Sequence, residues 1–411
     1  MNRQNLAAFV LLAASAALLW WVFGEHAPAP SGPTAGTPAS ANRYAPRDWE
    51  QPVREALNIS LFTFRDRNRD GVYDTGDLPM AMIDVDLLPQ GGTDPTLATQ
   101  SNINGYANFE MHRDDPQRAI HDADRDYLWR VAVPPGWSAT SGNAEQRIHF
   151  REMPGAPTGL IAAPPPQWVG LAADLEIRWQ VDPAAGDLAQ IRVEASGPDD
   201  QTQALAVRPD GTLRLPAVPG RWRLRAVQGT TGAADEREFS VGEAPVELAP
   251  MRFATDPPAA LPRVVTEDFE WLTRSIIDKL PNRHLGLDWD YLIAVDNQYY
   301  RGPGYVNGLM SGHVVGYNSS GHPVTVSARP GEKFDFVRGF FAVAWPQAHG
   351  EWLDVEAWRD GALVARHALR LSYLGPVQFE AELRGIDRLT LTARHYWQFV
   401  ADDLVFRLAE H

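Results

Sequence analysis

The segment from Asp66 to Asp77 constrains the fold more than any other stretch, because its oxygen-bearing side chains recur at fixed positions. Read as a twelve-residue loop, it places them at positions one, three, five, nine and twelve, which are Asp66, Asn68, Asp70, Asp74 and Asp77. Gly71 stands at position six, where such a loop turns sharply, and Val72 at position seven can offer its carbonyl oxygen. Oxygen ligands around a sharp turn suit a hard cation, so the segment predicts a Ca²⁺ site.

The closing position of this loop predicts that the site is weak. An EF-hand loop ends in Glu, whereas this loop ends in Asp77, whose shorter carboxylate reaches a cation less easily with both oxygens. The alternative interpretation is an acidic, solvated turn without a metal.

Length, charge and the absence of cysteine narrow the class of protein. The chain has 411 residues, enough for two to four domains, and 44% of them are apolar. The formal net charge of −15 argues against nucleic acid as a partner, because its phosphates would be repelled. The chain has no cysteine, which excludes disulfides, thiolate metal sites, cysteine nucleophiles and lipid attachment through a cysteine.

The amino terminus predicts export. Leu6–Phe23 is an uninterrupted apolar run that is long enough to cross a bilayer, and Trp20 and Trp21 suit the membrane interface. A basic residue precedes the run and an acidic one follows it, so the positive-inside rule places the amino terminus in the cytoplasm. We predict that residues 1–26 form an uncleaved signal anchor in the inner membrane, with the domains in the periplasm or at the cell surface.

A cleaved signal peptide is the alternative. Ala27-Pro-Ala29 resembles a cleavage site, but Pro30 at the next position should block the peptidase. Both interpretations place the remaining chain outside the cytoplasmic membrane. Residues 27–48 are rich in Pro and Ala and predict an extended linker.

Residues 49–153 form the first predicted domain. Ile59–Phe64 predicts a strand that leads directly into the acidic loop, and Met82–Leu87 alternates apolar and acidic residues as a half-buried strand does. Two further strands are predicted within Asn102–Phe109 and Tyr127–Gly136.

This order of features resembles the B-type domain of serine-aspartate-repeat surface adhesins, a calcium-loaded β-sandwich. The shared order is a strand, an Asp-x-Asn-x-Asp-Gly loop, a valine-rich strand, an Asn-Gly-Tyr-x-x-Phe strand and a closing strand before Pro-Gly. The resemblance implies that Asp66, Asn68, Asp70 and Asp77 are Ca²⁺ ligands. The sequence departs from the family in its closing Asp, where Glu is usual, and in having one copy in place of a tandem array.

A second acidic cluster, formed by Asp122, Asp124 and Asp126, precedes the Tyr127 strand. Its alternate carboxylates can complete a shared cation site or form a second one. Since Arg125 interrupts the cluster and no glycine follows it, a solvated acidic loop is the preferred interpretation.

Residues 154–166 read as a proline-rich hinge, and residues 167–252 as a small immunoglobulin-like sandwich. Leu175–Val181 and Ile191–Ala195 alternate polar and apolar residues, as strands of such a sandwich do. The alternate arginines of Pro219–Ala226 share one strand face, which predicts a solvated surface. We interpret this domain as a spacer.

Residues 262–411 are the longest and most aromatic part of the chain. The segments Leu280–Tyr291, Gly304–Gly312, Phe334–Trp345 and Phe399–Phe406 resemble the β-sandwich module of exported bacterial proteins with a Pro-Glu-Pro sorting tail. That module is related in pattern to jelly-roll carbohydrate-binding modules. The sequence as given lacks the sorting tail, so we expect the amino-terminal anchor to retain the protein.

The resemblance to jelly-roll modules implies a second Ca²⁺ site. In such modules an acidic residue of the first strand and one of the last often share a structural Ca²⁺. The corresponding residues here are Glu270 and Asp402. Because the termini of a jelly roll lie side by side, a cation can clamp them.

The glycine-broken stretch 297–308 predicts a carbohydrate-binding loop. Aromatic rings stack on the apolar faces of pyranose rings, and amide side chains bond to hydroxyl groups. The predicted stacking residues are Tyr299, Tyr300 and Tyr305. The predicted hydrogen-bonding residues are Asn297, Gln298 and Asn307.

The sequence carries no catalytic motif. Gly308-Leu-Met-Ser311-Gly312 has the wrong spacing for a nucleophile elbow, and the chain has neither a His-Glu-x-x-His motif nor a Gly-x-x-x-x-Gly-Lys loop. A carboxylate pair for glycoside hydrolysis is defined in space, so sequence alone leaves that alternative open. We expect a binding protein and not an enzyme.

The sequence thus predicts an all-β protein with three consecutive β-sandwich domains behind an N-terminal transmembrane helix. Its expected role is calcium-stabilised binding or adhesion at the cell envelope, with a glycan or an envelope protein as partner. The alternative is a structural spacer or scaffold subunit. Exposed aromatic residues on the last domain would favour the binding role.

Overall fold

The computed structural model describes ten stretches of the chain. These are residues 51–53, 56–89, 91–95, 97–112, 125–152, 161–163, 167–181, 187–253, 258–272 and 275–410. All of them belong to one compact unit, Tyr44–His411. The predicted signal anchor and linker lie outside the described residues, as do Asp122 and Asp124 of the second acidic cluster. Within the ten stretches, no helix is long and apolar enough to cross a membrane.

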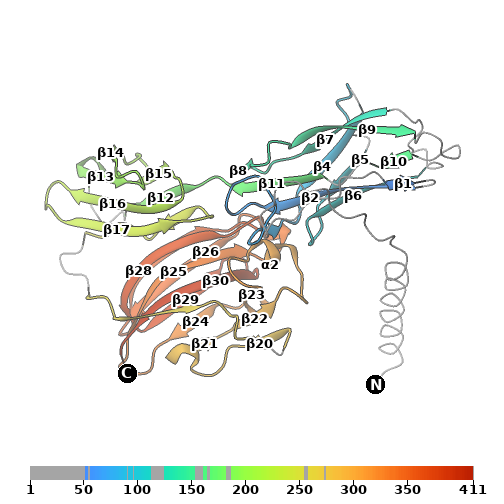
Figure 1. Ribbon diagram of the computed structural model, residues 1–411. Coiled ribbons are helices and arrows are strands. Elements are labelled where there is room, and N and C mark those ends of the chain that lie inside the picture. The colour runs from blue at the N-terminus through green and yellow to red at the C-terminus, as the bar shows by residue number, and fades with distance from the viewer. Residues whose placement is uncertain are drawn as a thin grey trace, which may run out of the picture. The chain divides into compact units, whose positions relative to one another are not determined.

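The prediction of an all-β fold is confirmed, because the described residues form five β-sheets (Figure 1). The strands follow the alternation of the sequence. In β16 (Gly220–Gln228), for example, Trp222, Leu224 and Ala226 are buried while the intervening arginines are exposed. Arg223 on the exposed face pairs with Glu236 across the sheet, with Nε and Oε1 2.6 Å apart. The arginine face is therefore solvated, as predicted, and Arg223 on it is also paired.

The first domain packs two sheets around one core. One sheet has the order β1-β10-β9-β7-β4-β5. Its strands are β1 (Gln51–Val53), β10 (Ile161–Ala163), β9 (Glu145–Glu152), β7 (Arg125–Val131), β4 (Asp84–Pro89) and β5 (Leu97–Gln100). The other has the order β3-β2-β11-β8, with β6 beside β2. Its strands are β3 (Leu78–Pro79), β2 (Ala56–Arg65), β11 (Gln167–Ala173), β8 (Trp137–Ala139) and β6 (Tyr106–His112).

The sheet pairing moves the boundary that the sequence predicted for this domain. Strand β11 pairs in parallel with β2 and antiparallel with β8. Residues 167–173, predicted to begin the second domain, therefore complete the first. Local alternation identifies β11 as a strand, but it carries no information about which sheet receives it.

The middle domain combines a sheet of its own with strands of a larger sheet. Its own sheet has the order β14-β13-β16-β17. The strands besides β16 are β13 (Ile191–Ser196), β14 (Thr202–Leu205) and β17 (Ala234–Val241). The larger sheet receives β12 (Glu176–Gln180), β15 (Thr212–Pro216) and β18 (Val246–Leu248). Trp179, Trp222, Leu224 and Phe239 fill the core between the two sheets.

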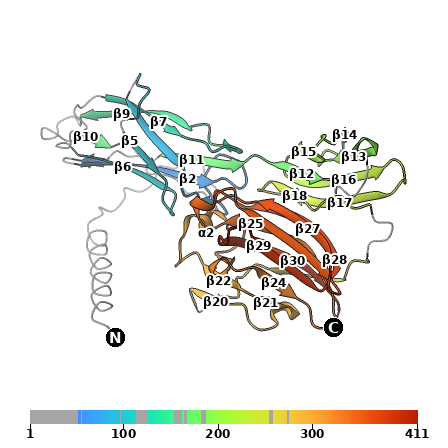
Figure 2. The same ribbon diagram turned by 180° about the vertical axis from the view of Figure 1, so that it is seen from behind.

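The last domain is a sandwich whose first sheet continues into the middle domain. That sheet runs β15-β12-β18-β28-β25-β30-β23-β22-β20, with β19 beside β30. The added strands are β28 (Val377–Ile386), β25 (Phe334–Val343), β30 (Phe399–Leu408), β23 (Val314–Asn318), β22 (Leu292–Asp296), β20 (Ile277–Lys279) and β19 (Arg263–Glu267). The contact is the parallel pairing of β18 with β28, both of which are labelled in Figure 2. The middle and last domains are therefore joined through one sheet, and not only through the chain that connects them.

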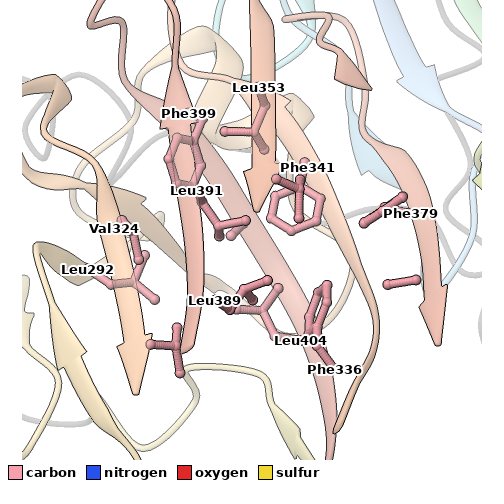
Figure 3. Close-up of a cluster of buried hydrophobic side chains, with 14 of the residues drawn as sticks. Leu292, Val324, Phe336, Phe341, Leu353, Phe379, Leu389, Leu391, Phe399 and Leu404 are labelled. Atoms are coloured by element: carbon pink, nitrogen blue, oxygen red, sulfur yellow. The ribbon is translucent and has the colours of Figure 1, made fainter. Parts of the chain in front are cut away.

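The second sheet of the last domain faces the first across an aromatic core. It has the order β21-β24-β29-β26-β27. Its strands are β21 (Asp288–Asp290), β24 (Val324–Ser327), β29 (Arg388–Ala393), β26 (Trp352–Arg359) and β27 (Ala362–Arg370). Figure 3 shows Phe336, Phe341, Phe379 and Phe399 pointing inward among the leucines of both sheets. This packing commits the inward-facing side chains of both sheets to the core.

Candidate functional site

The predicted Ca²⁺ loop connects β2 to β3, and its two end residues are buried. Asp66 is 1% exposed and its Oδ2 accepts a hydrogen bond from the Gly71 N–H at 2.8 Å. Asp77 accepts from the Arg67 N–H at 2.9 Å and from the Asp74 N–H at 3.0 Å. These bonds fold positions one and twelve of the loop into one turn.

One atom of the loop has no partner. The other carboxylate oxygen of Asp66, Oδ1, is buried and makes no hydrogen bond. Such an atom costs free energy unless a donor or a cation satisfies it. Gly71 adopts φ +77°, and a Cβ there would lie 2.9 Å from the Thr140 carbonyl oxygen. The turn therefore requires glycine, as the motif predicts.

The other loop positions remain near the surface. Asn68 Oδ1 accepts from the Asp70 N–H at 3.1 Å, and Asp70 Oδ1 accepts from the Val72 N–H at 2.8 Å. Asn68 Nδ2 lies 3.4 Å from Asp74 Oδ2. Across the residues that the structure describes, no group of three or more Asp, Glu or His side chains is arranged as a metal site. The loop thus has the turn and the ligand types for Ca²⁺, and metal binding stays a prediction.

Three arginines that alternate with the loop's first ligands reach away from it. Arg65 is 5% exposed and donates from Nη1 to the Asn307 carbonyl at 2.9 Å, and its Nη2 donates to the Leu309 carbonyl. Burial lowers the pKa of Arg65 to about 10, an effect that Glu243 opposes. Arg67 Nε donates to Glu243 Oε2 at 2.6 Å, and Arg69 donates to the Ala173 carbonyl. The loop therefore lies where the first domain meets the other two.

Asn307 completes this junction, which corrects its predicted role. Its Oδ1 accepts from the Ala81 N–H at 3.0 Å, and its Nδ2 donates to the carbonyls of Ala81 and Tyr373, each at 3.1 Å. Asn307 is 3% exposed. It is therefore a structural residue between domains and not a sugar ligand.

Tyr305, which was predicted to stack on a sugar ring, is also buried. Pro303 begins a short helix, α2 (Pro303–Asn307), where the sequence predicted a loop. A Cβ on Gly304 would lie 2.1 Å from the Val343 carbonyl oxygen, so α2 presses directly against β25. Tyr305 is consequently 1% exposed, packed edge-on against Tyr300, Tyr317 and Trp345, and burial raises its pKa above the ordinary range.

The other four predicted sugar-binding residues comprise one buried and three exposed side chains. Asn297 is buried at 6% exposure and donates from Nδ2 to the Tyr305 carbonyl at 3.4 Å. Gln298 is exposed, and Tyr299 and Tyr300 are 70% and 38% exposed. Of the six predicted residues, only these three can meet a ligand from solvent.

Glu270 and Asp402, the predicted ligands of a second Ca²⁺ site, both accept hydrogen bonds from one backbone segment. Asp402 is fully buried and its Oδ2 accepts from the N–H groups of Met310 and Ser311 at 2.7 and 3.1 Å. Glu270 Oε1 accepts from the N–H groups of His313 and Val314, both at 2.7 Å. Burial raises the pKa of Asp402 well above its usual value, and the Asp403 charge adds to this. Both carboxylates hold the 310–314 backbone, and a Ca²⁺ ion shared between them stays a prediction.

Sequence reasoning missed a group of exposed aromatic residues at one end of the last domain. We call Tyr291, His322, Tyr396 and Trp397 the end cluster. Tyr291 and Tyr396 are 54% and 71% exposed, and Trp397 is 37% exposed. The rings of Tyr291 and His322 are 4.6 Å apart and tilted by 31°. The signal in the sequence was the adjacent aromatic pair Tyr396-Trp397, directly before the Phe399–Phe406 segment.

Buried hydrogen bonds hold the three loops of the end cluster together. Asn318 is fully buried, and its Nδ2 donates to the carbonyls of His322 and Trp397 at 3.1 and 3.2 Å. Its Oδ1 accepts from the Phe399 N–H at 2.6 Å. The Ser319 N–H donates to the Tyr291 carbonyl at 2.8 Å. The rings are thus carried on a fixed backbone.

The backbone of the end cluster is also strained. Tyr291 and Tyr396 have φ of +62° and +59°, in the left-handed region that bulky residues rarely adopt. Such conformations cost on the order of 1–3 kcal/mol each and concentrate at functional sites. Here they accompany two of the most exposed rings of the last domain.

Comparison with known proteins yields no family. No family model matches the sequence, and no curated protein matches it. Matching structures include the shaft pilin SpaA of Lactobacillus rhamnosus GG, at 11% identity and a TM-score of 0.21 over 47% of this chain and 96% of that one. The TIE protein of Bacillus anthracis matches at 12% identity and a TM-score of 0.21, over 46% of this chain and 33% of that one.

A third match contains a carbohydrate-binding module. The CBM51-2 and INT domains of Clostridium perfringens ZmpB match at 9% identity and a TM-score of 0.22, over 56% of this chain and 44% of that one. At these identities and TM-scores, none of the matches identifies a function for this chain. The fold and the sites define only the class, an all-β protein of linked sandwich domains.

Proposed function

We propose that this chain is a calcium-stabilised binding protein of the cell envelope, exported and held by its amino-terminal anchor, whose last domain binds carbohydrate. The end cluster is the observation that carries this proposal. Three exposed aromatic rings on a fixed, strained backbone offer apolar faces to solvent, which suits stacking on pyranose rings. His322, also exposed, supplies a nearby hydrogen-bonding group for sugar hydroxyls.

The proposed binding site is tested by replacing two of its exposed tyrosines, with two exposed tyrosines outside it as the control. We expect the full chain to bind a glycan from a panel of neutral bacterial and plant polysaccharides. Replacing Tyr291 and Tyr396 by Asn should weaken that binding roughly tenfold or more, because two stacking rings are lost. Asn is the appropriate replacement because it tolerates the left-handed backbone. Heat of binding and tryptophan fluorescence are the measurements.

The control is the double change Tyr299→Asn and Tyr300→Asn, which removes two exposed rings from the loop that the sequence predicted. We expect it to leave the affinity unchanged. Loss of binding in the control alone would move the site to that loop. If the unchanged chain ignores the whole panel, the carbohydrate proposal fails.

The second candidate function is a rigid spacer or scaffold subunit. The observation that favours it is the sheet that runs through the middle and last domains, together with the buried junction at Arg65 and Asn307. A chain built in this way holds its domains at fixed positions. This role becomes the better one if no glycan binds.

The calcium part of the proposal is supported by the unpartnered Asp66 oxygen and the glycine turn. We expect the full chain to bind Ca²⁺ with a dissociation constant of about 10⁻⁴ M, as extracellular modules do. Millimolar Ca²⁺ should then raise the free energy of unfolding by about 1.4 kcal/mol. Asp70→Ala should abolish this increase, which thermal unfolding in Ca²⁺ and in chelator measures.

Asp199→Ala is the matched control for the calcium experiment. Asp199 is exposed and accepts from the N–H two residues ahead at 3.3 Å, as Asp70 does, but lies outside the loop. It should leave the Ca²⁺ response intact. Superimposable unfolding curves of the unchanged chain in Ca²⁺ and in chelator would disprove the site.

A further inference from the structure

A cavity of about 730 Å³ opens between the middle domain and the last domain. Strand β17 lines one side, and residues of β26, β27, β28 and β30 line the rest. These strands belong to three different sheets, and the pairing of β18 with β28 brings them together. The cavity lies apart from the end cluster and from the Ca²⁺ loop, since none of their residues lines it.

Arginines outnumber acidic residues in the cavity lining although the chain is acidic, and one of them, Arg366, pairs with Glu356 outside the lining. Six arginines line it: Arg237, Arg252, Arg359, Arg366, Arg384 and Arg407. Four acidic residues line it: Asp235, Glu236, Glu238 and Glu382. Because the whole chain carries a net charge of −15, this local surplus of cations is unusual and favours an anionic ligand.

Two of the arginines are not neutralised by a carboxylate of their own. The guanidinium of Arg359 donates to the carbonyls of Gly385 at 2.8 Å and Arg384 at 2.6 Å, and no carboxylate within the described stretches pairs with it. Arg407 shares the carboxylate of Glu382 with Arg384, at 3.0 and 3.3 Å. A carboxylate from a ligand would therefore find charge that the protein leaves available.

The floor of the cavity combines flat rings with aliphatic side chains. His367, 7% exposed, stacks on Phe379 with ring centroids 5.1 Å apart and planes 6° from parallel. Its Nε2 is buried and makes no hydrogen bond, although Glu247 Oε1 lies 3.4 Å away. Val364 and Leu383 also line the cavity. These four side chains give the cavity lining an apolar part, which we call the floor.

The floor is fixed by a buried ion pair. Arg237 and Asp235, whose side chains are 12% and 7% exposed, form two hydrogen bonds of 2.7 and 3.0 Å. Arg237 also donates to the Ala381 carbonyl of β28 at 3.4 Å, and Asp235 accepts from the Arg252 N–H at 2.7 Å. A site held in this way needs little reorganisation to bind a ligand.

We propose that this cavity binds an acidic carbohydrate, with the sugar carboxylate on Arg359 and Arg407 and a pyranose face against the apolar floor. Guanidinium groups recognise carboxylates through paired, charge-assisted hydrogen bonds. The volume falls within the 300–1,000 Å³ range of small-ligand sites and accommodates a short oligosaccharide. The overall negative charge disfavours nucleic acid as the source of the anion. This site is independent of neutral-glycan binding by the end cluster.

The test compares one sugar with and without its charge. The full chain is titrated with trigalacturonic acid, with its methyl ester and with inorganic phosphate, and the heat of binding is measured. We expect the acid to bind, and the neutral ester to bind about tenfold more weakly or not at all. Added salt should weaken binding of the acid. Equal binding of acid and ester, or no binding of either, would overturn the proposal. Phosphate that binds as tightly as the sugar would also overturn it, because the site would then recognise any anion.

Variants locate the binding in this cavity. Arg407→Gln and Arg359→Gln should each weaken binding of the acid about tenfold. Arg407→Gln is the safer of the two for folding, because Arg359 also bonds to two carbonyls. Arg221→Gln removes the same charge from an exposed face of the middle domain and should change nothing. A loss in Arg221→Gln equal to that in Arg407→Gln would overturn the assignment to the cavity. The Tyr291→Asn, Tyr396→Asn chain should bind the acid normally, which separates this site from the proposed function.

Discussion

Replacing Asn307 by Leu is expected to lower the free energy of unfolding by about 3–5 kcal/mol. The substitution leaves the Ala81 N–H, the Ala81 carbonyl and the Tyr373 carbonyl buried without their partner. Each unsatisfied buried group costs about 1–3 kcal/mol, and apolar contact by Leu returns only part of this. Urea-induced unfolding of the full chain measures the loss.

Two companion variants show whether the hydrogen bonds are responsible. Asn307→Asp keeps an acceptor for the Ala81 N–H but removes both donated bonds, so we expect a substantial loss here as well. Asn282→Leu makes the same chemical change at an exposed position and should alter stability by less than about 0.5 kcal/mol. An Asn307→Leu chain as stable as Asn282→Leu would contradict the junction described here.

The junction also shows where prediction from the sequence ends. Periodicity identified the strands, because alternation of apolar and polar residues reports which side of a strand is buried. It placed Ile59–Phe64 and Ile191–Ala195 within β2 and β13, and it began the Pro219–Ala226 strand one residue before β16. The turn at Gly71 followed equally from local chemistry.

The wrong predictions concern residues whose environment is set by partners distant in the sequence. Asn307 bonds to Ala81, 226 residues earlier, so nothing near Asn307 distinguishes a buried amide from a sugar ligand. Tyr305 is buried because Gly304 lets α2 approach β25 closely. The local glycine content had instead predicted an exposed loop at this position. Similarly, β11 belongs to the first domain because it pairs with β2, and the sequence of β11 alone does not indicate this partner.

The end cluster and the cavity were missed for a related reason. Each is assembled from segments that are unremarkable alone. The end cluster combines loops around residues 291, 322 and 396, held by Asn318. The cavity combines β17, β26, β27, β28 and β30, and in the sequence their arginines resemble those of ordinary solvated strand faces. Exposure and proximity, which the sequence does not give, define both.

Glu380 is expected to make stability fall as pH rises. It lies on β28, 5% exposed, opposite Leu248 of β18 and near Arg338, whose Nη1 is 3.9 Å away. Burial raises its pKa from 4.5 to about 7, although hydrogen bonding from Gln378 and the Arg338 charge oppose the increase. The folded chain therefore binds more protons than the unfolded chain between these two pH values. By linkage, the contribution of Glu380 is full below about pH 4.5 and is lost as pH rises through about 7.

The size of this effect is on the order of 3 kcal/mol between pH 4.5 and pH 8. Glu380→Gln removes the titration and keeps an acceptor for the Gln378 amide, which donates to Glu380 Oε1 at 2.7 Å. We therefore expect the variant to be more stable than the unchanged chain at pH 8, with the difference shrinking towards pH 5. Free energies of unfolding in urea at several pH values measure it.

Comparing variant with unchanged chain isolates Glu380 from other carboxyl groups whose pKa values burial also raises, such as Asp77 and Asp403. Glu194→Gln, at an exposed position of β13, is the control and should give a stability curve parallel to that of the unchanged chain. A Glu380→Gln curve that is also parallel would show that Glu380 is charged in the folded chain at neutral pH. In that case the pair with Arg338, and not burial, would govern the carboxylate at the strand where the middle and last domains share a sheet.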